Sequence, residues 1–458
     1  MDCDVVVVGA GVSGLATAFD LQGRGHAVRI LEAAPRAGGV IASRRRDGAL
    51  YETGPNSTLD TTPLIGELLD AAGVAAERLD ATAAAAKRYV VRAGRLVALP
   101  ASPGAFLATP LFSLRAKLAL AREPFVAPAP PGREESVAVF VRRRLGTEFL
   151  EYAIEPFVAG VYAGDPERLS VQAAFPRLHA LEQRYRSLIR GQILGARERA
   201  RDRERSKSTA ASFSFRDGMQ TLTDALARGL HGLETGTRVT RLGKDENGLF
   251  EVEGERSGGR VAARSRAVVL AVPADAAASL VRPAAPGAAA ALDAIPYAPV
   301  AVVASVYRRA DVRHPLDGFG FLCPRKEGRS ILGTLFSSSM FDGRADADSA
   351  LLTTFVGGAR KPELARSGPD EIAKEVEREL EVLLGATSPR WREVIQWPRA
   401  IPQYTLGHLG RIATVEQAEA AVPGLFFRSN YRGGVSVGDC IKSAHAGAAA
   451  VSAFLAAG

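Results

Sequence analysis

The amino-acid sequence predicts an α/β fold of two or three domains, and three observations support this. The chain opens with a β-branched run at 4–8, a helical pattern after it and a second apolar run at 27–31, which together predict a βαβ unit. Strand and helix patterns then alternate in separated blocks as far as the C-terminus, which is typical of an α/β protein with antiparallel insertions. The length of 458 residues is too great for one compact core, since a domain takes about 150 residues.

The remaining elements follow in chain order. Helical spacing occupies 64–80, and residues 88–99 alternate around Gly94 as a hairpin does. Residues 136–200 are predicted to be mainly helical, and a further helix covers 222–230. Beyond these, strands are predicted at 237–242, 250–254, 261–263, 267–272, 298–307, 331–336 and 424–429, and helices at 372–384 and 441–455.

Composition restricts the class of protein. The chain is 47% hydrophobic and 24% charged, which excludes a disordered chain and a polytopic membrane protein. No window approaches 18 uncharged apolar residues, so no bilayer-spanning segment is predicted. The N-terminus enters a strand without a basic leader, which predicts a cytoplasmic protein. Cys3, Cys323 and Cys440 form no C-x-x-C pair, so neither a disulfide framework nor a metal site is expected.

The formal net charge is +8, and most of the cations are arginines. Residues 184–207 are especially dense in arginine, but Glu198, Asp202 and Glu204 interleave with these cations. Pairs at i,i+3 and i,i+4 favour a solvated helix or a polar connector over a phosphate-binding track. No nucleic-acid partner is therefore predicted.

Residues 101–132 differ from the rest of the chain because they are rich in proline and place apolar side chains beside cations. Phe106, Leu107 and Leu114 lie near Arg115 and Lys117. Such a stretch can lie on a membrane surface, and it can equally be a domain-connecting loop with a core helix. The sequence leaves both interpretations open.

The first motif that carries chemistry is a glycine loop. Gly9, Gly11 and Gly14 form G-x-G-x-x-G between the first strand and the first helix. These glycines permit a tight turn, the approach of a pyrophosphate and close helix packing, while the helix N-terminus supplies free N–H groups. Glu32 ends the second strand, where a carboxylate can accept hydrogen bonds from a ribose. The sequence therefore predicts a dinucleotide-binding site.

Two further segments indicate which dinucleotide binds. Arg36, Gly38 and Gly39 follow Glu32 as E-x-x-x-R-x-G-G, which resembles the FAD-binding signature of the amine oxidase and phytoene desaturase superfamily. Members of that superfamily close the flavin site with a strand, a glycine turn and a helix, and residues 424–450 resemble this segment. A glycine turn there lets backbone N–H groups approach the flavin N1 and O2 edge. The absence of C-x-x-C excludes a dithiol flavoreductase.

Several longer segments narrow the resemblance. They are E-T-G-P-N-S at 52–57, K-R-Y-V-V-R-A-G at 87–94, G-V-Y-A-G-D-P-E-R-L-S at 160–170, G-F-G-F-L-C-P at 318–324, L-G-T-L-F-S-S-S-M-F at 332–341, T-T-F-V-G-G at 353–358, W-P-R-A-I-P-Q-Y at 397–404 and G-D-C-I at 438–441. In order and number they resemble the flavin-dependent protoporphyrinogen/coproporphyrinogen oxidases of haem biosynthesis over nearly the whole chain.

This resemblance implies an architecture of three parts. A Rossmann-like FAD-binding domain of the amine oxidase/p-hydroxybenzoate hydroxylase type would comprise 1–80, 208–290 and 395–458. An α+β substrate domain would comprise 81–100 and 291–394, and a helical domain 101–207 would contact a membrane or a twin subunit.

The resemblance also implies the residues of the cofactor site. FAD would be lined by Gly9, Ala10, Gly11, Val12, Ser13, Gly14, Glu32, Ala33, Arg36, Gly39, Gly54, Pro55, Asn56, Ser57, Val239, Trp397, Gly434, Val435, Ser436 and Val437. Asn56 would in addition act in catalysis by hydrogen-bonding pyrrole N–H groups, although an Asn after Pro55 can simply cap a turn.

The substrate residues are implied in the same way. Arg88 would pair with a propionate, for which a desolvated guanidinium is suited, although an arginine at a hairpin edge can also be a surface cation. Leu322, Leu335 and Phe355 would form apolar walls around the tetrapyrrole, and Gly164 would let the backbone pass close to it. Core packing and a simple turn are the ordinary alternatives for these four residues.

The implied reaction is the six-electron oxidation of protoporphyrinogen IX to protoporphyrin IX, with three rounds of flavin reduction and dioxygen as the acceptor, giving hydrogen peroxide. Hydride loss from a bridging carbon leaves a cation delocalised into the pyrroles, so the reaction needs orientation more than a strong base. None of the six histidines lies in the longer segments between 52 and 441 that carry the resemblance. Coproporphyrinogen III is the alternative substrate. A flavin amine oxidase, a carotenoid desaturase and a non-catalytic flavin- and porphyrin-binding protein are more distant alternatives.

Overall fold

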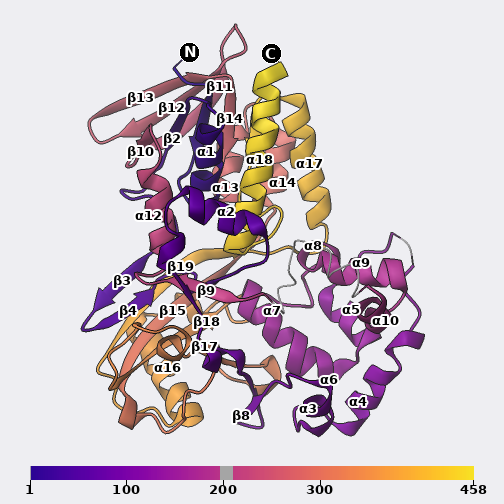
Figure 1. Cartoon of the computed structure of the whole chain (residues 1–458). Coiled ribbons are helices and arrows are strands. Elements are labelled where there is room, and N and C mark those ends of the chain that lie inside the picture. The colour runs from indigo at the N-terminus through magenta and orange to yellow at the C-terminus, as the bar shows by residue number, and fades with distance from the viewer. Residues whose placement is uncertain (1, 131, 196–209, 458) are drawn as a thin grey trace.

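The structure is a computed structural model that describes residues 2–130, 132–195 and 210–457 (Figure 1). Most of the arginine-rich segment 184–207, predicted to be a solvated helix or a polar connector, lies outside these residues. The described chain confirms the predicted α/β class with antiparallel insertions.

A parallel sheet forms the core of the nucleotide-binding part. It contains, in spatial order, β10 (Leu233–Glu234), β2 (Val28–Leu31), β1 (Val5–Val8), β14 (Ala267–Leu270) and β20 (Leu425–Phe427). β1 pairs in parallel with β2 and β14, so that Val5 lies between Val28 and Ala267. Both faces of this sheet are covered, which is why the four residues of β1 form an unbroken apolar run that is entirely buried.

Helices cover one face of the parallel sheet, and helices with a small sheet cover the other. The first face is covered by α1 (Val12–Gly23), α2 (Pro63–Ala71), α12 (Gln220–Arg228) and α18 (Val437–Ala457). The second face is covered by α13 (Ala274–Val281), α14 (Pro286–Asp293), α17 (His408–Ala421) and the antiparallel strands β11 (Arg238–Lys244), β12 (Phe250–Arg256) and β13 (Gly259–Ser265).

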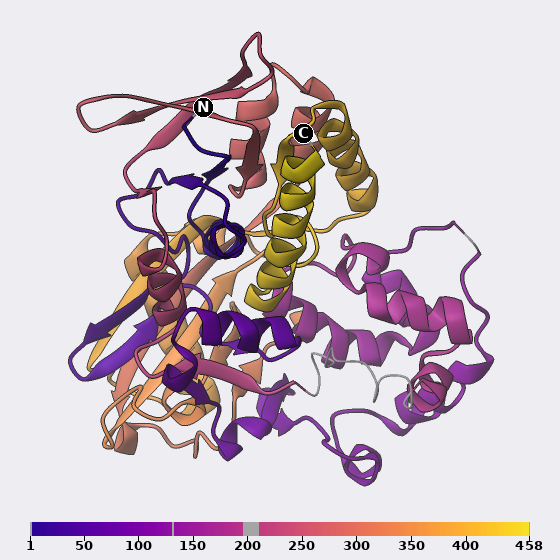
Figure 2. The same cartoon turned by 45° about the horizontal axis from the view of Figure 1, so that its top comes forward.

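One helix of the described chain, α18, is long and apolar enough to cross a membrane by length and composition. In the fold it lies alongside α1 over the parallel sheet (Figure 2). Ile441, Ala448 and Val451 are buried there together with Leu15. The apolar side of α18 is therefore part of the core around the parallel sheet.

The helix predicted over 64–80 is shorter in the structure. It is α2, and it ends at Ala71 because Gly73 adopts a left-handed conformation with φ +69°. A 3₁₀ turn at Ala75–Glu77 and the short strand β6 (Arg78–Asp80) follow. β6 and β5 (Thr58–Leu59) both pair with β9 (Ser212–Phe215) in a small antiparallel sheet.

A mixed sheet forms the second part of the molecule. It contains, in spatial order, β19 (Trp391–Pro402), β15 (Tyr297–Arg308), β18 (Ser349–Gly357), β17 (Ile331–Leu335), β16 (Gly320–Leu322), β7 (Arg88–Arg92) and β8 (Arg95–Ala98). The hairpin predicted at 88–99 is thus confirmed as β7 and β8. α16 (Pro369–Leu384) packs on one face, and the hairpin of β3 (Ser43–Arg46) and β4 (Ala49–Glu52) packs near the β15 end of the other.

Helices that lie on the right in Figure 1 form the third part. They are α3 (Pro103–Ala108), α4 (Leu114–Ala121), α5 (Val137–Arg144), α6 (Thr147–Phe149), α7 (Glu155–Tyr162), α8 (Val171–Ala174), α9 (Pro176–Tyr185) and α10 (Leu188–Leu194), with a π-helical turn at Leu150–Ile154 before α7. Arg144 is fully buried among them and pairs with Glu123 and Glu182, since a buried charge requires partners. β19 runs through position 395, where a domain boundary was expected, and the division into three domains stays a prediction.

Candidate active site

The glycine loop lies between β1 and α1, as the motif predicts. A Cβ on Gly14 would lie 1.9 Å from the carbonyl oxygen of Gly9, so this position admits only glycine. A Cβ on Gly11 would meet no described atom within 4 Å. Gly11 therefore borders open space at the start of α1, where no side chain caps the helix N-terminus. An uncapped N-terminus beside open space is suited to a pyrophosphate. Ala10, Val12 and Ser13 complete this loop, and Ala10 and Ser13 are buried.

Glu32 follows β2 directly, and its carboxylate contacts the backbone of the glycine loop. Its Oε2 accepts a hydrogen bond from the Ala10 N–H at 2.6 Å, and its Oε1 accepts one from the Ala34 N–H at 2.8 Å. Each carboxylate oxygen keeps a lone pair for a ribose hydroxyl. The Glu32 carbonyl accepts from the Thr237 N–H at 2.7 Å, which brings the start of β11, with Val239, to this end of the sheet. Ala33 is exposed beside Glu32.

Arg36 organises its own loop. Its Nη1 donates to the carbonyls of Ala37 and Ile41, and its Nη2 donates to the Gly39 carbonyl at 2.8 Å. Gly39 has φ +59°, and a Cβ there would lie 3.2 Å from the Gly11 Cα. The chain after β2 therefore turns back against the glycine loop, and Arg36 holds this turn in place.

The segment Gly54–Ser57 lies between this turn and the mixed sheet. A Cβ on Gly54 would lie 2.2 Å from the Val40 carbonyl oxygen. On the other side, Trp397 of β19 donates from Nε1 to the Thr53 carbonyl at 2.7 Å. Pro55 and Ser57 are half-buried, and Ser212 donates to the Ser57 hydroxyl at 3.1 Å. The part of the molecule around the parallel sheet and the mixed sheet therefore meet at this segment.

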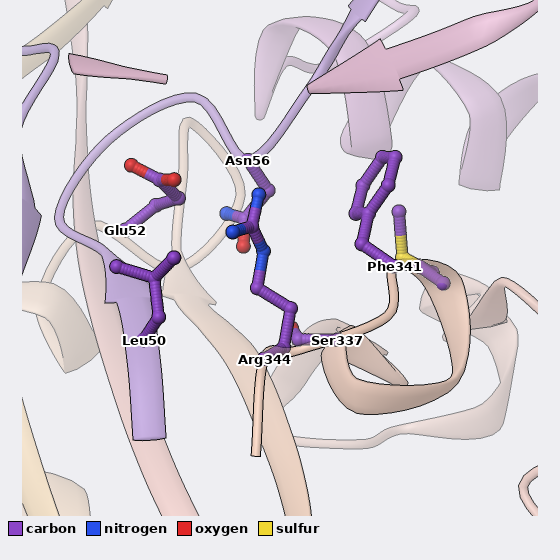
Figure 3. Close-up of a pocket in the computed structure, with 7 residues that line it drawn as sticks. Leu50, Glu52, Asn56, Ser337, Phe341 and Arg344 are labelled. Carbon is purple, nitrogen blue, oxygen red and sulfur yellow. The ribbon is translucent and has the colours of Figure 1, made fainter. Parts of the chain in front are cut away.

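Asn56 lines a small cavity of about 10 Å³, room for roughly one water (Figure 3). Its Nδ2 donates to the Gly54 carbonyl at 3.2 Å, so Asn56 does cap the turn after Pro55. Its amide oxygen accepts no hydrogen bond from the residues that the structure describes. The other residues that line the cavity are Leu50, Glu52, Ser337, Met340, Phe341 and Arg344.

Glu52 and Arg344 are buried charges in this cavity. Glu52 accepts hydrogen bonds from the Ser43 hydroxyl at 2.7 Å and the Met219 N–H at 2.9 Å. Burial nevertheless raises the pKa of Glu52 to about 7. Arg344 donates to the Ser214 hydroxyl at 2.7 Å, and burial lowers its pKa. Neither residue is predicted from the sequence, whose one signal is that Glu52 opens the motif E-T-G-P-N-S.

The C-terminal turn precedes α18. The Ser436 hydroxyl accepts from the Asp439 N–H at 3.2 Å, and the Asp439 carboxylate accepts from the Ser436 N–H at 3.3 Å, which is a reciprocal cap. Gly434 has φ +127°, and Val435 and Val437 pack on the helical part and on the parallel-sheet core respectively. A Cβ on Gly438 would lie 3.5 Å from the Leu59 carbonyl oxygen, so this turn adjoins the segment that follows Ser57.

The register of the mixed sheet brings the predicted substrate residues together. One cross-strand row contains Arg88, Gly320 and Leu335, and the row two residues along contains Val90, Leu322, Gly333 and Phe355. Residues two apart on a strand share a face. Arg88, Leu322, Leu335 and Phe355 therefore lie on one face, here called the slot face, opposite to the face that α16 covers.

Arg88 lies at the exposed start of β7. Its guanidinium is 5.2 Å from the centre of the Phe319 ring, and Phe319 packs in the same cluster as Leu335. Arg88 makes no ion pair within the described part of the chain. α7 covers Leu322, since a Cβ on Gly160 would lie 3.1 Å from the Leu322 Cδ2.

Gly164 is buried at the end of α7 and is crowded by the protein itself. A Cβ there would lie 2.9 Å from the Gln403 Oε1 and 2.9 Å from the Leu169 Cδ1. Packing around this turn thus favours glycine at position 164, because a larger residue would require the Gln403 and Leu169 side chains to move.

Comparison with known proteins identifies the family. The profile described as "Flavin containing amine oxidoreductase" matches residues 12–452. The chain belongs to this family. A chloroplastic protoporphyrinogen oxidase of Nicotiana tabacum is 36% identical over 99% of the chain and 86% of that protein. A coproporphyrinogen III oxidase of Bacillus subtilis is 29% identical over 98% of the chain and 97% of that protein.

A protein of known structure has a similar fold. A crystal structure from Exiguobacterium sp. 255-15, named as a protoporphyrinogen oxidase, superposes with a TM-score of 0.82 at 23% identity over 99% of each chain. This likeness confirms the fold.

The family establishes a flavoprotein oxidoreductase with FAD as its cofactor, and the loop at Gly11 fits that group. The open space beside Gly11, the uncapped start of α1 and the Glu32 carboxylate form a cradle for an ADP moiety. Two further segments lie near this cradle. Gly54–Ser57 adjoins β19 of the mixed sheet, and the turn at Gly434–Val437 adjoins the residues that follow Ser57.

Proposed function

We propose that the chain is an FAD-dependent porphyrinogen oxidase that converts protoporphyrinogen IX to protoporphyrin IX. The observation that carries this proposal is the slot face, which Arg88 shares with the apolar side chains of Leu322, Leu335 and Phe355. A porphyrinogen presents the matching chemistry, an apolar macrocycle with propionate groups on one side. The relatives named as protoporphyrinogen oxidases, at 34–36% identity, add support.

Each residue then has a defined task. Arg88 binds a propionate and sets the orientation of the macrocycle, while Leu322 and Phe355 exclude water from its faces. Asn56 offers its amide oxygen to pyrrole N–H groups, because its Nδ2 is engaged by the Gly54 carbonyl.

FAD, when bound, accepts the electrons that leave the sp³ bridges. The substrate loses six hydrogens in all, which reduce three dioxygen molecules to three hydrogen peroxide molecules. Because the pyrroles stabilise the cation left by hydride loss, orientation is the main contribution of the protein.

Coproporphyrinogen III is the second candidate substrate, and the Bacillus subtilis relative named for that activity favours it. This substrate carries two more propionates, which require further cations. The relatives named as coproporphyrinogen III oxidases are 29–30% identical, below the protoporphyrinogen oxidases, so the dicarboxylate is preferred.

We further propose a cytoplasmic enzyme that contacts a membrane surface through the helical part. Leu107, Leu114, Leu118 and Phe125 are between 56% and 83% exposed, which is unusual for large apolar side chains. The exposed cation Arg115 lies among them, as in segments that lie on anionic lipid. A twin subunit on this face is the alternative.

Two measurements test the reaction. Purified protein with FAD is given each porphyrinogen in air, and porphyrin fluorescence is recorded. We expect turnover of both, faster with protoporphyrinogen IX. Without air, protoporphyrinogen IX should bleach the bound flavin. A flavin that stays unbleached indicates a non-catalytic binding protein, and turnover of an amine indicates an amine oxidase.

A further inference from the structure

The motif W-P-R-A-I-P-Q-Y ends in two residues, Gln403 and Tyr404, to which the reaction assigns no role. They lie between β19 and α17 and are 4% and 3% exposed. Their polar atoms contact two turns that are far apart in the sequence. One turn adjoins the slot face, and the other precedes α18.

Gln403 holds the C-terminal end of α7. Its Nε2 donates to the Tyr162 carbonyl at 2.8 Å. The last carbonyls of a helix have no partner within the helix, so this bond caps α7 immediately before the turn. Ala163 in that turn has φ +45°, a strained conformation for a residue with a side chain. The Gln403 Oε1 also bounds the space at Gly164.

The backbone of the same segment pairs with the loop that follows this turn. The Ser170 N–H donates to the Tyr404 carbonyl at 2.8 Å, and the Leu406 N–H donates to the Arg168 carbonyl at 3.0 Å. Leu169 and Thr405 form an antiparallel bridge between these bonds. The segment 403–406 is therefore bound to the loop 162–170 by both side chain and backbone.

The Tyr404 side chain extends to the cofactor side. Its hydroxyl donates to the Asn430 carbonyl at 2.7 Å and accepts from the Gly434 N–H at 2.9 Å. These two bonds span the connection between β20 and α18. They use both the donor and one acceptor of a hydroxyl that lies in a buried residue, so removing the oxygen leaves two polar backbone groups without this partner.

His408 fixes the Tyr404 ring. The two rings stack with centroids 4.1 Å apart and an interplanar angle of 13°. Because a carbonyl oxygen only accepts, His408 Nε2 donates to the Tyr431 carbonyl at 2.9 Å. Burial lowers the pKa of His408 to about 4, so the ring is neutral near pH 7.

We propose that Gln403 and Tyr404 are positioning residues that tie the turn at Gly164 to the turn at Gly434. The inference rests on the proposed function, together with the expectation from the family resemblance that Gly434–Val437 lines the flavin site and Gly164 lies on the substrate side. The tie keeps the turn at Gly434 in the conformation that binds FAD, and it couples that conformation to the end of α7.

Tyr404→Phe is the test, and Tyr162→Phe is its matched control. Tyr162 is 4% exposed, its ring centroid lies 5.8 Å from that of Tyr404, and its hydroxyl donates to the Ala174 carbonyl at 3.1 Å. Each substitution removes one buried hydroxyl from the same aromatic cluster, but only that of Tyr404 contacts the turn at Gly434.

We expect Tyr404→Phe to raise the Kd for FAD about tenfold, because the free chain holds the binding conformation of the turn for a smaller fraction of the time. The midpoint potential of the bound flavin should also shift. Tyr162→Phe should lower Tm but keep the wild-type potential and a Kd within about twofold. Equal changes in both variants, or a wild-type Kd and potential in Tyr404→Phe, would overturn the proposal.

Hydrogen exchange on the wild-type chain keeps the question decidable if Tyr404→Phe does not fold. Release of FAD should speed amide exchange at 430–437 and also at 162–170. Faster exchange at 430–437 alone would show that the turns are not tied. A wild-type chain that binds no FAD would instead refute the proposed function, and a chain that binds FAD normally with untied turns refutes only this inference.

Discussion

Arg88→Ala removes the guanidinium at the edge of the slot face. Arg88 is exposed and makes no ion pair within the described residues, and its one recorded side-chain contact is the Phe319 ring at 5.2 Å. The free energy of unfolding should therefore change by no more than about 1 kcal/mol. FAD content should not change, because Arg88 belongs to the mixed sheet, whereas the glycine loop at Gly11 belongs to the parallel sheet.

The effect on the reaction should be much larger. A charge-assisted hydrogen bond contributes about 1.5–3 kcal/mol, and each 1.4 kcal/mol is a factor of ten. We therefore expect kcat/KM for protoporphyrinogen IX to fall roughly 10- to 150-fold in Arg88→Ala, mainly through a higher KM. The kcat/KM of Arg88→Lys should lie between those of the wild type and Arg88→Ala, because an ammonium keeps the charge but not the planar fork of the guanidinium.

Lys87→Ala is the matched control. Lys87 is also an exposed cation, but its Nζ pairs with Asp317 at 2.6 Å and lies over the Tyr89 ring, on the opposite side of β7. The assay is the initial rate of porphyrin fluorescence at several substrate concentrations, with FAD content measured by absorbance. Wild-type kcat/KM in Arg88→Ala, or an equal loss in Lys87→Ala, would refute the role of Arg88.

Three other predictions follow from the geometry. Gly11→Ala should leave the Tm of the FAD-free chain unchanged but weaken FAD binding at least tenfold. Gly14→Ala should weaken FAD binding and also lower that Tm, because its Cβ would lie 1.9 Å from a carbonyl oxygen. Equal Tm values for the two FAD-free variants would contradict this. Because burial raises the pKa of Glu52 from 4.5 to about 7, the folded chain holds a proton that the unfolded chain has lost between these pH values. The free energy of unfolding should therefore fall by up to about 3 kcal/mol as pH rises through this interval, and Glu52→Gln should remove that slope in denaturant titrations at pH 5 and pH 8. The double variant Leu114→Glu and Leu118→Glu should no longer sediment with anionic vesicles, and its turnover should not change. If the wild-type chain is instead a dimer that the double variant dissociates, this face binds a twin subunit.

Local patterns were sufficient for much of the fold and for the cofactor loop. The run Val5–Val8, the glycines after it and Glu32 act through short-range geometry, so their spacing alone predicts a strand, a turn and an acidic strand end. The helix over 64–80 was predicted too long because apolar spacing continues beyond Gly73, whose left-handed conformation ends the helix. The spacing of apolar residues does not indicate where the backbone leaves the helical conformation.

Long-range contacts were beyond such patterns. Arg36 is predicted to line the FAD site, and the structure adds that three of its five N–H donors bind carbonyls of its own loop, a contact that its spacing from Glu32 does not indicate. Glu52 and Arg344 come from strands and loops almost 300 positions apart and meet only because the hairpin of β3 and β4 packs on the mixed sheet. Nothing near either residue in the sequence indicates the other.

The sequence by itself determined that this chain has a dinucleotide loop, a flavin-type second motif and an arginine at a hairpin edge. Tertiary structure alone decided which side chains share the slot face, because side-chain direction alternates along a strand and a shift of one residue in register would turn Arg88 to the side of α16. It also decided that Gln403 and Tyr404 connect two distant turns, since hydrogen bonds between segments depend on how the elements pack.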